Sequence, residues 1–157
     1  MTLFRMGVMI VALLGAGTVL AQEPSADTMQ ALKEKVKADK KLVVSANLNL
    51  TEAEAKGFWP LYDGYQKELE AINKRMLKLI TDYADAYRAD SVTDDKAKAL
   101  LDEALAIESA ETDLKKSYVS KLSKALPLKK VARYIQIENK IRAVVRYELA
   151  SAIPLAK

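Results

Sequence analysis

The side chains most able to do chemistry in this chain are its charged ones, and they are sorted by sign along the sequence. From Thr81 to Leu114 there are ten acidic and three basic residues, a net charge of −7. From Lys115 to Arg146 there are ten basic residues and one acidic residue, a net charge of +9. Fields of this size attract and steer partners of opposite charge. The pattern therefore predicts a molecule with an acidic end and a basic flank.

The residue types that many enzymes and metal sites need are missing. The chain has no Cys and no His. Their absence excludes disulfides, acylation on cysteine, most zinc and copper sites, and catalysis by Ser-His-Asp or Cys-His arrangements. The sequence also shows no Gly-rich phosphate loop and no calcium loop of the EF-hand type. We expect a non-enzymatic protein without catalytic residues, cofactor or metal, although hard cations held by carboxylates remain open.

The first 21 residues have the pattern of a secretory signal peptide. Arg5 supplies a positive charge, Met6 to Leu20 is an uncharged and mostly apolar run, and Val19-Leu20-Ala21 is typical of a cleavage site. The run is shorter than the roughly 20 apolar residues of a membrane helix, with an uncleaved anchor as the alternative. We expect cleavage after Ala21, a location in the periplasm, and one all-helical domain over residues 22–157.

The elements that must position the charged residues are predicted to be helices. Gly is scarce, Ala, Leu, Lys and Glu are abundant, and no window alternates with a period of two. Thr51 and Glu54 form a capping box at a helix start, Thr93 is a good N-cap, and Pro127 ends a helix. The expected helices span residues 27–46, 51–89, 94–124 and 128–150.

The helix expected over residues 51–89 carries an apolar stripe that begins with Phe58, Tyr62 and Tyr65. Pro60 lies inside this helix and should bend its axis. Short connections make neighbouring helices antiparallel. The sequence therefore predicts an all-α fold, an elongated helical hairpin of about four helices whose stripe an antiparallel dimer would bury. On the last helix, the residues expected to point inward are Val131, Ile135, Ile141, Val145 and Leu149.

Antiparallel geometry also predicts which residues of neighbouring helices face each other. The first hairpin places Tyr65 opposite Tyr118, and the second places Glu111 opposite Arg142. Glu111 and Glu138 lie on or near apolar stripes, where an unpaired carboxylate is costly. We expect each of these two glutamates to pair with an Arg of the last helix, or else to lie at a solvated edge.

The basic region is the expected binding surface. Its positions favour acidic partners, unfolded clients or anionic lipid headgroups, the last as a weak contact. Trp59, at the edge of the aromatic stripe, is a further candidate anchor. Nucleic acid is not expected in the periplasm. Two other interpretations of the basic region remain open. In one, it pairs with the acidic end of a second copy in an antiparallel dimer, and in the other it is a solvated charged face without a partner. The candidate cations are Lys129, Lys130, Arg133, Lys140, Arg142 and Arg146.

Leu50-Thr51-x-x-Glu54 opens the long helix of a chain with a signal peptide and no enzyme signature. In these respects the chain resembles the Spy/CpxP-like periplasmic proteins, which are marked by Leu-Thr-x-x-Gln motifs. Glu54 stands where that family has Gln, and the His ligands of its metal-binding members are absent. The blocks over residues 58–65 and 132–141 are also similar to uncharacterised exported helical proteins.

The resemblance implies a thin, curved antiparallel dimer whose concave face is basic with apolar patches. It also implies either ATP-independent chaperoning or modulation of an envelope-stress or metal-responsive sensor. We therefore expect a chaperone or client-binding module for unfolded or envelope proteins. A regulatory or structural partner of an envelope protein is the alternative function.

Overall fold

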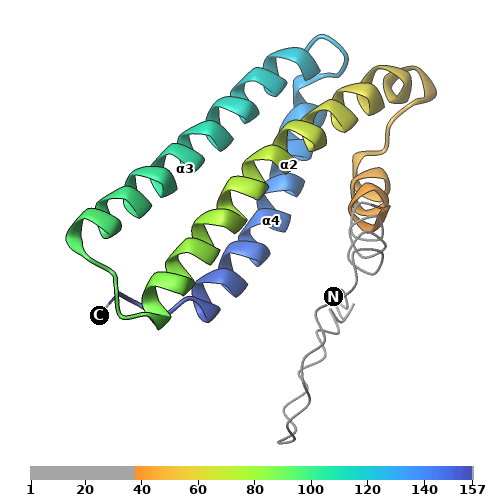
Figure 1. Ribbon diagram of the computed structural model, residues 1–157. Coiled ribbons are helices and arrows are strands. Elements are labelled where there is room, and N and C mark those ends of the chain that lie inside the picture. Colours follow the sequence, from red (N-terminus) through yellow and green to blue (C-terminus); the bar gives the residue numbers. More distant parts are fainter. Residues whose placement is uncertain (1–37, 157) are drawn as a thin grey trace, which may run out of the picture. The chain divides into compact units, whose positions relative to one another are not determined.

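Helices joined by short turns make up the described part of the chain (Figure 1). The computed structural model describes residues 38–156, of which those from Asp39 onward belong to one unit. After helical residues 38–48 come α2 (Glu52–Arg88), α3 (Asp94–Leu122) and α4 (Leu128–Ala152). No strand occurs between residues 38 and 156, and the expected all-α fold is confirmed. The expected signal peptide and residues 27–37 of the first expected helix lie outside the described residues.

The helix starts follow their capping residues. The Thr51 hydroxyl accepts from the Glu54 N–H at 3.3 Å, and the Glu54 carboxylate accepts from the Thr51 N–H at 2.7 Å. The predicted capping box is therefore confirmed. The Thr93 hydroxyl likewise accepts from the Lys96 N–H at 3.3 Å and caps α3. Pro127 precedes α4, whose first turn has no side-chain cap.

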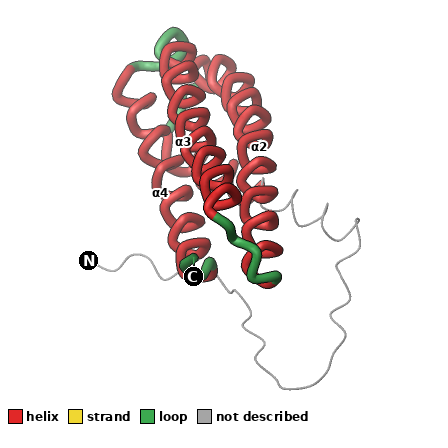
Figure 2. Tube along the Cα trace, turned by 60° about the vertical axis from the view of Figure 1, so that its left-hand side comes forward, coloured by secondary structure: helices red, strands yellow, loops and turns green. Residues whose placement is uncertain are grey.

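The predicted antiparallel hairpin is formed by α2 and α3 (Figure 2). The rings of Tyr65 and Tyr118 lie edge to face, with centroids 5.3 Å apart, so their predicted pairing is confirmed. The Tyr118 hydroxyl donates to Glu68 Oε1 at 2.6 Å. Gly64 allows this close approach, because a Cβ there would lie 2.8 Å from the Tyr118 hydroxyl oxygen. Pro60 lies inside α2, as expected.

Aromatic side chains pack α4 against α2. Tyr134 of α4 is fully buried, and its ring centroid lies 5.2 Å from that of Phe58, 6.1 Å from that of Tyr62 and 6.0 Å from that of Tyr65. Burial raises the pKa of the Tyr62, Tyr65 and Tyr134 hydroxyls far above the ordinary tyrosine value, because the ionised form would lose its hydration. These tyrosines are therefore neutral core residues.

The helical residues 39–48 pack on the same core. Val44 and Leu48 are buried and belong to the cluster that contains the aromatic rings. The helix continues to Leu48, two residues beyond its expected end, because Leu48 is itself part of the core. It stops at Asn49, whose φ of 48° lies in the left-handed region that asparagine tolerates better than most residues.

Candidate interaction surface

Glu111 is the centre of an ion cluster that joins α4 to α3. Its side chain is 3 % exposed, and its Oε2 lies 2.8 Å from Arg142 Nη2 and 3.1 Å from Arg146 Nη2. Lys115 Nζ lies 3.6 Å from Oε1. Burial alone would raise the pKa of Glu111, but the hydrogen bond from Arg142 and the three positive charges outweigh burial and hold it below the ordinary value. The predicted pairing of Glu111 with Arg142 is confirmed.

Glu138 is paired differently from the prediction. Its Oε2 lies 2.7 Å from Lys40 Nζ, and its Oε1 accepts from Gln66 Nε2 at 2.9 Å. The prediction that Glu138 pairs with an Arg of the last helix is wrong. The reason is geometric, since Glu138 faces α2 and the segment of Lys40. Arg142, one turn further along α4, is instead directed at Glu111 on α3.

Three of the six candidate cations hold the fold together. Lys130 Nζ lies 2.6 Å from a Glu54 carboxylate oxygen, and this contact, with the hydrogen bonds from Thr51, lowers the pKa of Glu54. Arg142 and Arg146 bind the buried Glu111 carboxylate, although Arg146 keeps 52 % of its side chain exposed. Their charge is compensated within the protein.

Trp59 also packs within the protein. Its ring centroid lies 4.9 Å from that of Phe58 and 5.4 Å from that of Tyr62, and the side chain is partly buried against the core. Lys41 Nζ stands 4.9 Å from the centroid of the indole and 3.3 Å from a carboxylate oxygen of Asp63. A partner that reached for Trp59 would therefore have to displace Lys41.

The other three candidate cations form a free row on α4. Lys129, Arg133 and Lys140 are exposed, and no side-chain hydrogen bond, ion pair or ring contact joins them to another residue in the described range. Their spacing of four and seven residues puts them on one stripe of the helix. The stripe continues into Val144 and Tyr147, which are 58 % and 72 % exposed. We call these five residues the α4 face.

Two contacts fix the position of the α4 face along α2. Arg142 Nη1 donates to Asn73 Oδ1 at 2.6 Å, and the Tyr83 hydroxyl donates to the Pro154 carbonyl at 2.9 Å. Since α2 and α4 run in the same direction (Figure 1), a constant rise per residue from these two contacts places Val144 and Tyr147 at about the level of Leu77 on α2. Leu77 is 65 % exposed. The sequence did not single out Val144, Tyr147 or Leu77. Val144 and Tyr147 follow Lys140 at steps of four and three residues, and this helical spacing was the signal that could have identified them.

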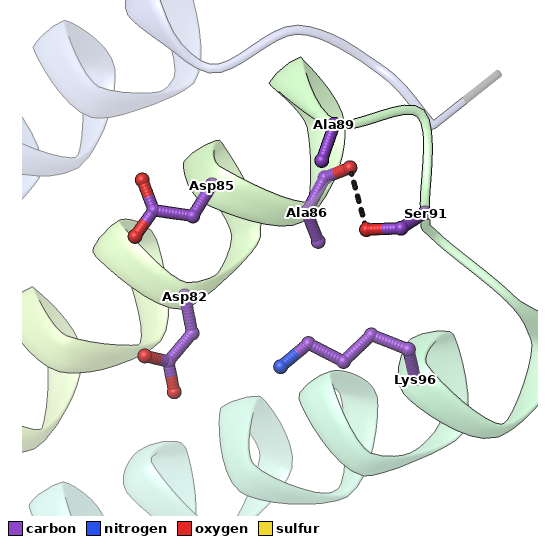
Figure 3. A pocket seen from close by; sticks show the side chains of 6 residues that line it. All are labelled: Asp82, Asp85, Ala86, Ala89, Ser91 and Lys96. Carbon is purple, nitrogen blue, oxygen red and sulfur yellow. Dashed lines mark hydrogen bonds between the residues drawn. The ribbon is translucent and has the colours of Figure 1, made fainter.

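A shallow hollow of about 400 Å³ lies at the turn between α2 and α3 (Figure 3). Figure 3 shows Lys96 directed toward the Asp82 carboxylate, and the Ser91 hydroxyl donates to the Ala86 carbonyl at 3.3 Å. Asp82 also lies 2.8 Å from Lys78, whose hydrogen bond lowers the pKa of Asp82. Within residues 38–156 no group of three or more His, Cys, Asp or Glu residues is placed to hold a metal ion. The carboxylate of Asp82 is thus balanced by lysine, whereas the cations of the α4 face have no ion pair within residues 38–156.

Comparison of the chain with protein-family models, with curated proteins and with solved structures finds no match. Over the described residues, no helix is both long and apolar enough to cross a membrane.

Proposed function

We propose that the protein is an exported, non-enzymatic binding module that holds unfolded or envelope proteins on its α4 face without ATP. The observation that carries the proposal is a row of cations that have no partner among the described residues and that leads directly into Val144 and Tyr147. The cations are Lys129, Arg133 and Lys140. Aligned like charges repel one another, and no ion pair within the described residues offsets this repulsion. An acidic ligand from outside would relieve this repulsion.

The form of the α4 face describes the ligand. From Lys129 to Tyr147 the face extends about 27 Å along the helix, at roughly 1.5 Å per residue. The outer side of a helix is convex, so a ligand makes many shallow contacts instead of filling one pocket. Such contacts suit acidic, partly apolar segments of an unfolded chain, and they weaken as salt screens the charges. The resemblance to Spy/CpxP-like proteins implies the same kind of activity and supports the proposal.

The test is suppression of aggregation of a chemically unfolded, acidic protein by the purified chain, followed by light scattering without ATP. A triple variant, Lys129→Glu with Arg133→Glu and Lys140→Glu, should lose suppression. The matched control reverses three exposed lysines on other helices and should retain it. The control changes are Lys56→Glu, Lys74→Glu and Lys98→Glu, at side chains that are 79 %, 70 % and 74 % exposed.

Arg142 is left unchanged in these variants because its loss would strip the buried Glu111 of its nearest partner. Circular dichroism checks that both triple variants keep their helices. Equal suppression by the α4-face variant and the control would contradict the proposed site. No suppression by the unmodified protein, together with one specific co-purifying envelope protein, would favour the regulatory alternative.

A further inference from the structure

A second exposed face, on α3, carries the opposite charge. Leu101 and Leu105 are 59 % and 56 % exposed. Glu108 and Thr112 follow on the same side of the helix at steps of three and four residues, and both are exposed. The carboxylate of Glu108 has no partner among residues 38–156. We call these four residues the α3 face.

The α3 face matches the α4 face when the two helices run antiparallel. Along α3, the two leucines and the glutamate are separated by four and then three residues. Along α4 in the reverse direction, the tyrosine, valine and lysine are separated by three and then four. Side chains at such steps lie on one side of each helix and can pack ridge against groove. One register then pairs Leu101 with Tyr147, Leu105 with Val144, Glu108 with Lys140, and Thr112 with Gln136.

We propose that the α3 face of one copy of the protein docks on the α4 face of a second copy, in this antiparallel register. The occupant is a second copy because one chain carries both halves of the match, two apolar pairs and one pair of opposite charge. The region of net charge −7 contains the α3 face, and the region of net charge +9 contains the three cations of the α4 face, so the two regions add long-range attraction between copies. Because the faces are different surfaces, the contact is heterologous, and copies add head to tail unless a ring closes.

The absence of cysteine makes the register directly testable. Two single variants of the full chain, Leu105→Cys and Val144→Cys, are mixed and mildly oxidised. The proposal predicts a mixed disulfide between the two variants, because their Cβ atoms would be neighbours. The matched control mixes Leu105→Cys with Lys129→Cys, about 22 Å along α4 from Val144. Equal yields in the two mixtures, or no mixed disulfide in either, would overturn the register.

Light scattering tests the association itself in the cysteine-free protein. The mass should rise with concentration, and the exposed substitutions Leu101→Ser and Leu105→Ser should each weaken association about tenfold. A mass that stays that of one chain at every concentration would overturn the inference.

The second copy would cover the α4 face that the proposed function uses, so the two can be tested apart. A double leucine variant that stays monomeric should still suppress client aggregation, because its α4 face is intact. Suppression without any self-association would refute the docking alone. A mixed disulfide in a protein without client binding would refute the proposed function alone.

Discussion

Removal of the charge of Glu111 is expected to cost the protein a large part of its stability. Glu111→Gln nearly preserves volume but leaves Arg142, whose side chain is 17 % exposed, without a carboxylate. Arg142 Nε already has no hydrogen-bond partner. Loss of one member of a buried ion pair costs about 3–5 kcal/mol. Since Arg142 keeps Asn73 and Arg146 can turn to water, we expect the lower end, about 3 kcal/mol.

The matched change is Arg146→Ala, which leaves Glu111 with Arg142 and Lys115. Because the Arg146 side chain is half exposed, its loss should cost at most about 1 kcal/mol. Urea denaturation followed by circular dichroism gives both free energies of unfolding by linear extrapolation. Equal costs for the two variants, or a cost below about 1 kcal/mol for Glu111→Gln, would refute the idea that buried charge at Glu111 holds α4.

The same cluster predicts a dependence on pH. The pKa of Glu111 is lower in the folded protein than in the unfolded chain, so its contribution is fully present above the ordinary glutamate value, about 4.3. That contribution is lost as the pH falls from this value through the folded pKa. The free energy of unfolding should therefore fall more steeply in the unmodified protein than in Glu111→Gln. Parallel curves below about pH 4.3 would contradict this assignment.

Three further predictions concern the other contacts of the core. Gly64→Ala should destabilise the hairpin, because the new Cβ would meet the Tyr118 hydroxyl. The same change in a Tyr118→Phe background should instead stabilise α2 by up to about 1 kcal/mol, and thermal unfolding of the four proteins measures both effects. Burial and the Glu68 carboxylate raise the pKa of Tyr118 to about 12. The contribution of Tyr118 to stability is therefore present below the ordinary tyrosine pKa of about 10 and is lost as the pH rises toward 12. Denaturation at alkaline pH, compared with Tyr118→Phe, measures this loss. Lys40→Met should lower the free energy of unfolding by about 3 kcal/mol, because it leaves the buried Glu138 without its cation. Urea denaturation measures this change. A neutral effect would show that the hydrogen bond from Gln66 alone satisfies the Glu138 carboxylate.

The contacts across the hairpins could be predicted because they depend only on the positions of the turns and on the rise per residue of a helix. Once the turns were placed, a constant rise per residue determined which positions on neighbouring helices lie level. Tyr65 with Tyr118 and Glu111 with Arg142 both follow from this geometry, and both are confirmed. The capping box at Thr51 is equally local. Predictions of this kind need no knowledge of side-chain packing.

The rotation of α4 about its axis could not be predicted in the same way. Of the five residues expected to point inward, Val131 is buried, whereas Val145 is 46 % exposed. The rotation is set instead by Tyr134, whose ring fills the space beside three aromatic residues of α2, and by Glu138, which must reach Lys40 and Gln66. Neither Tyr134 nor Glu138 is among the five apolar residues that were predicted to point inward, although Glu138 was expected to lie on or near the apolar stripe.

The candidate site was predicted only in part for a related reason. The sequence presents six similar cations on one helix, and their roles diverge only when the tertiary fold brings carboxylates to some of them. Lys130 meets Glu54 and Arg142 meets Glu111, whereas Lys129 and Arg133 meet nothing in the described residues. Charge counts could locate the basic region, but not the cations that stay free.

The ion pair between Lys40 and Glu138 joins positions 98 residues apart along the chain, from 40 to 138. It links the first described helical segment to the last helix, and the core beneath both is completed by Tyr134 of that helix. Contacts between such distant positions form slowly, because a long loop must close before they yield any stability. A growing chain that does not yet include α4 cannot close this core. We therefore expect residues 39–48, although synthesised early, to reach their final position only after α4 is available.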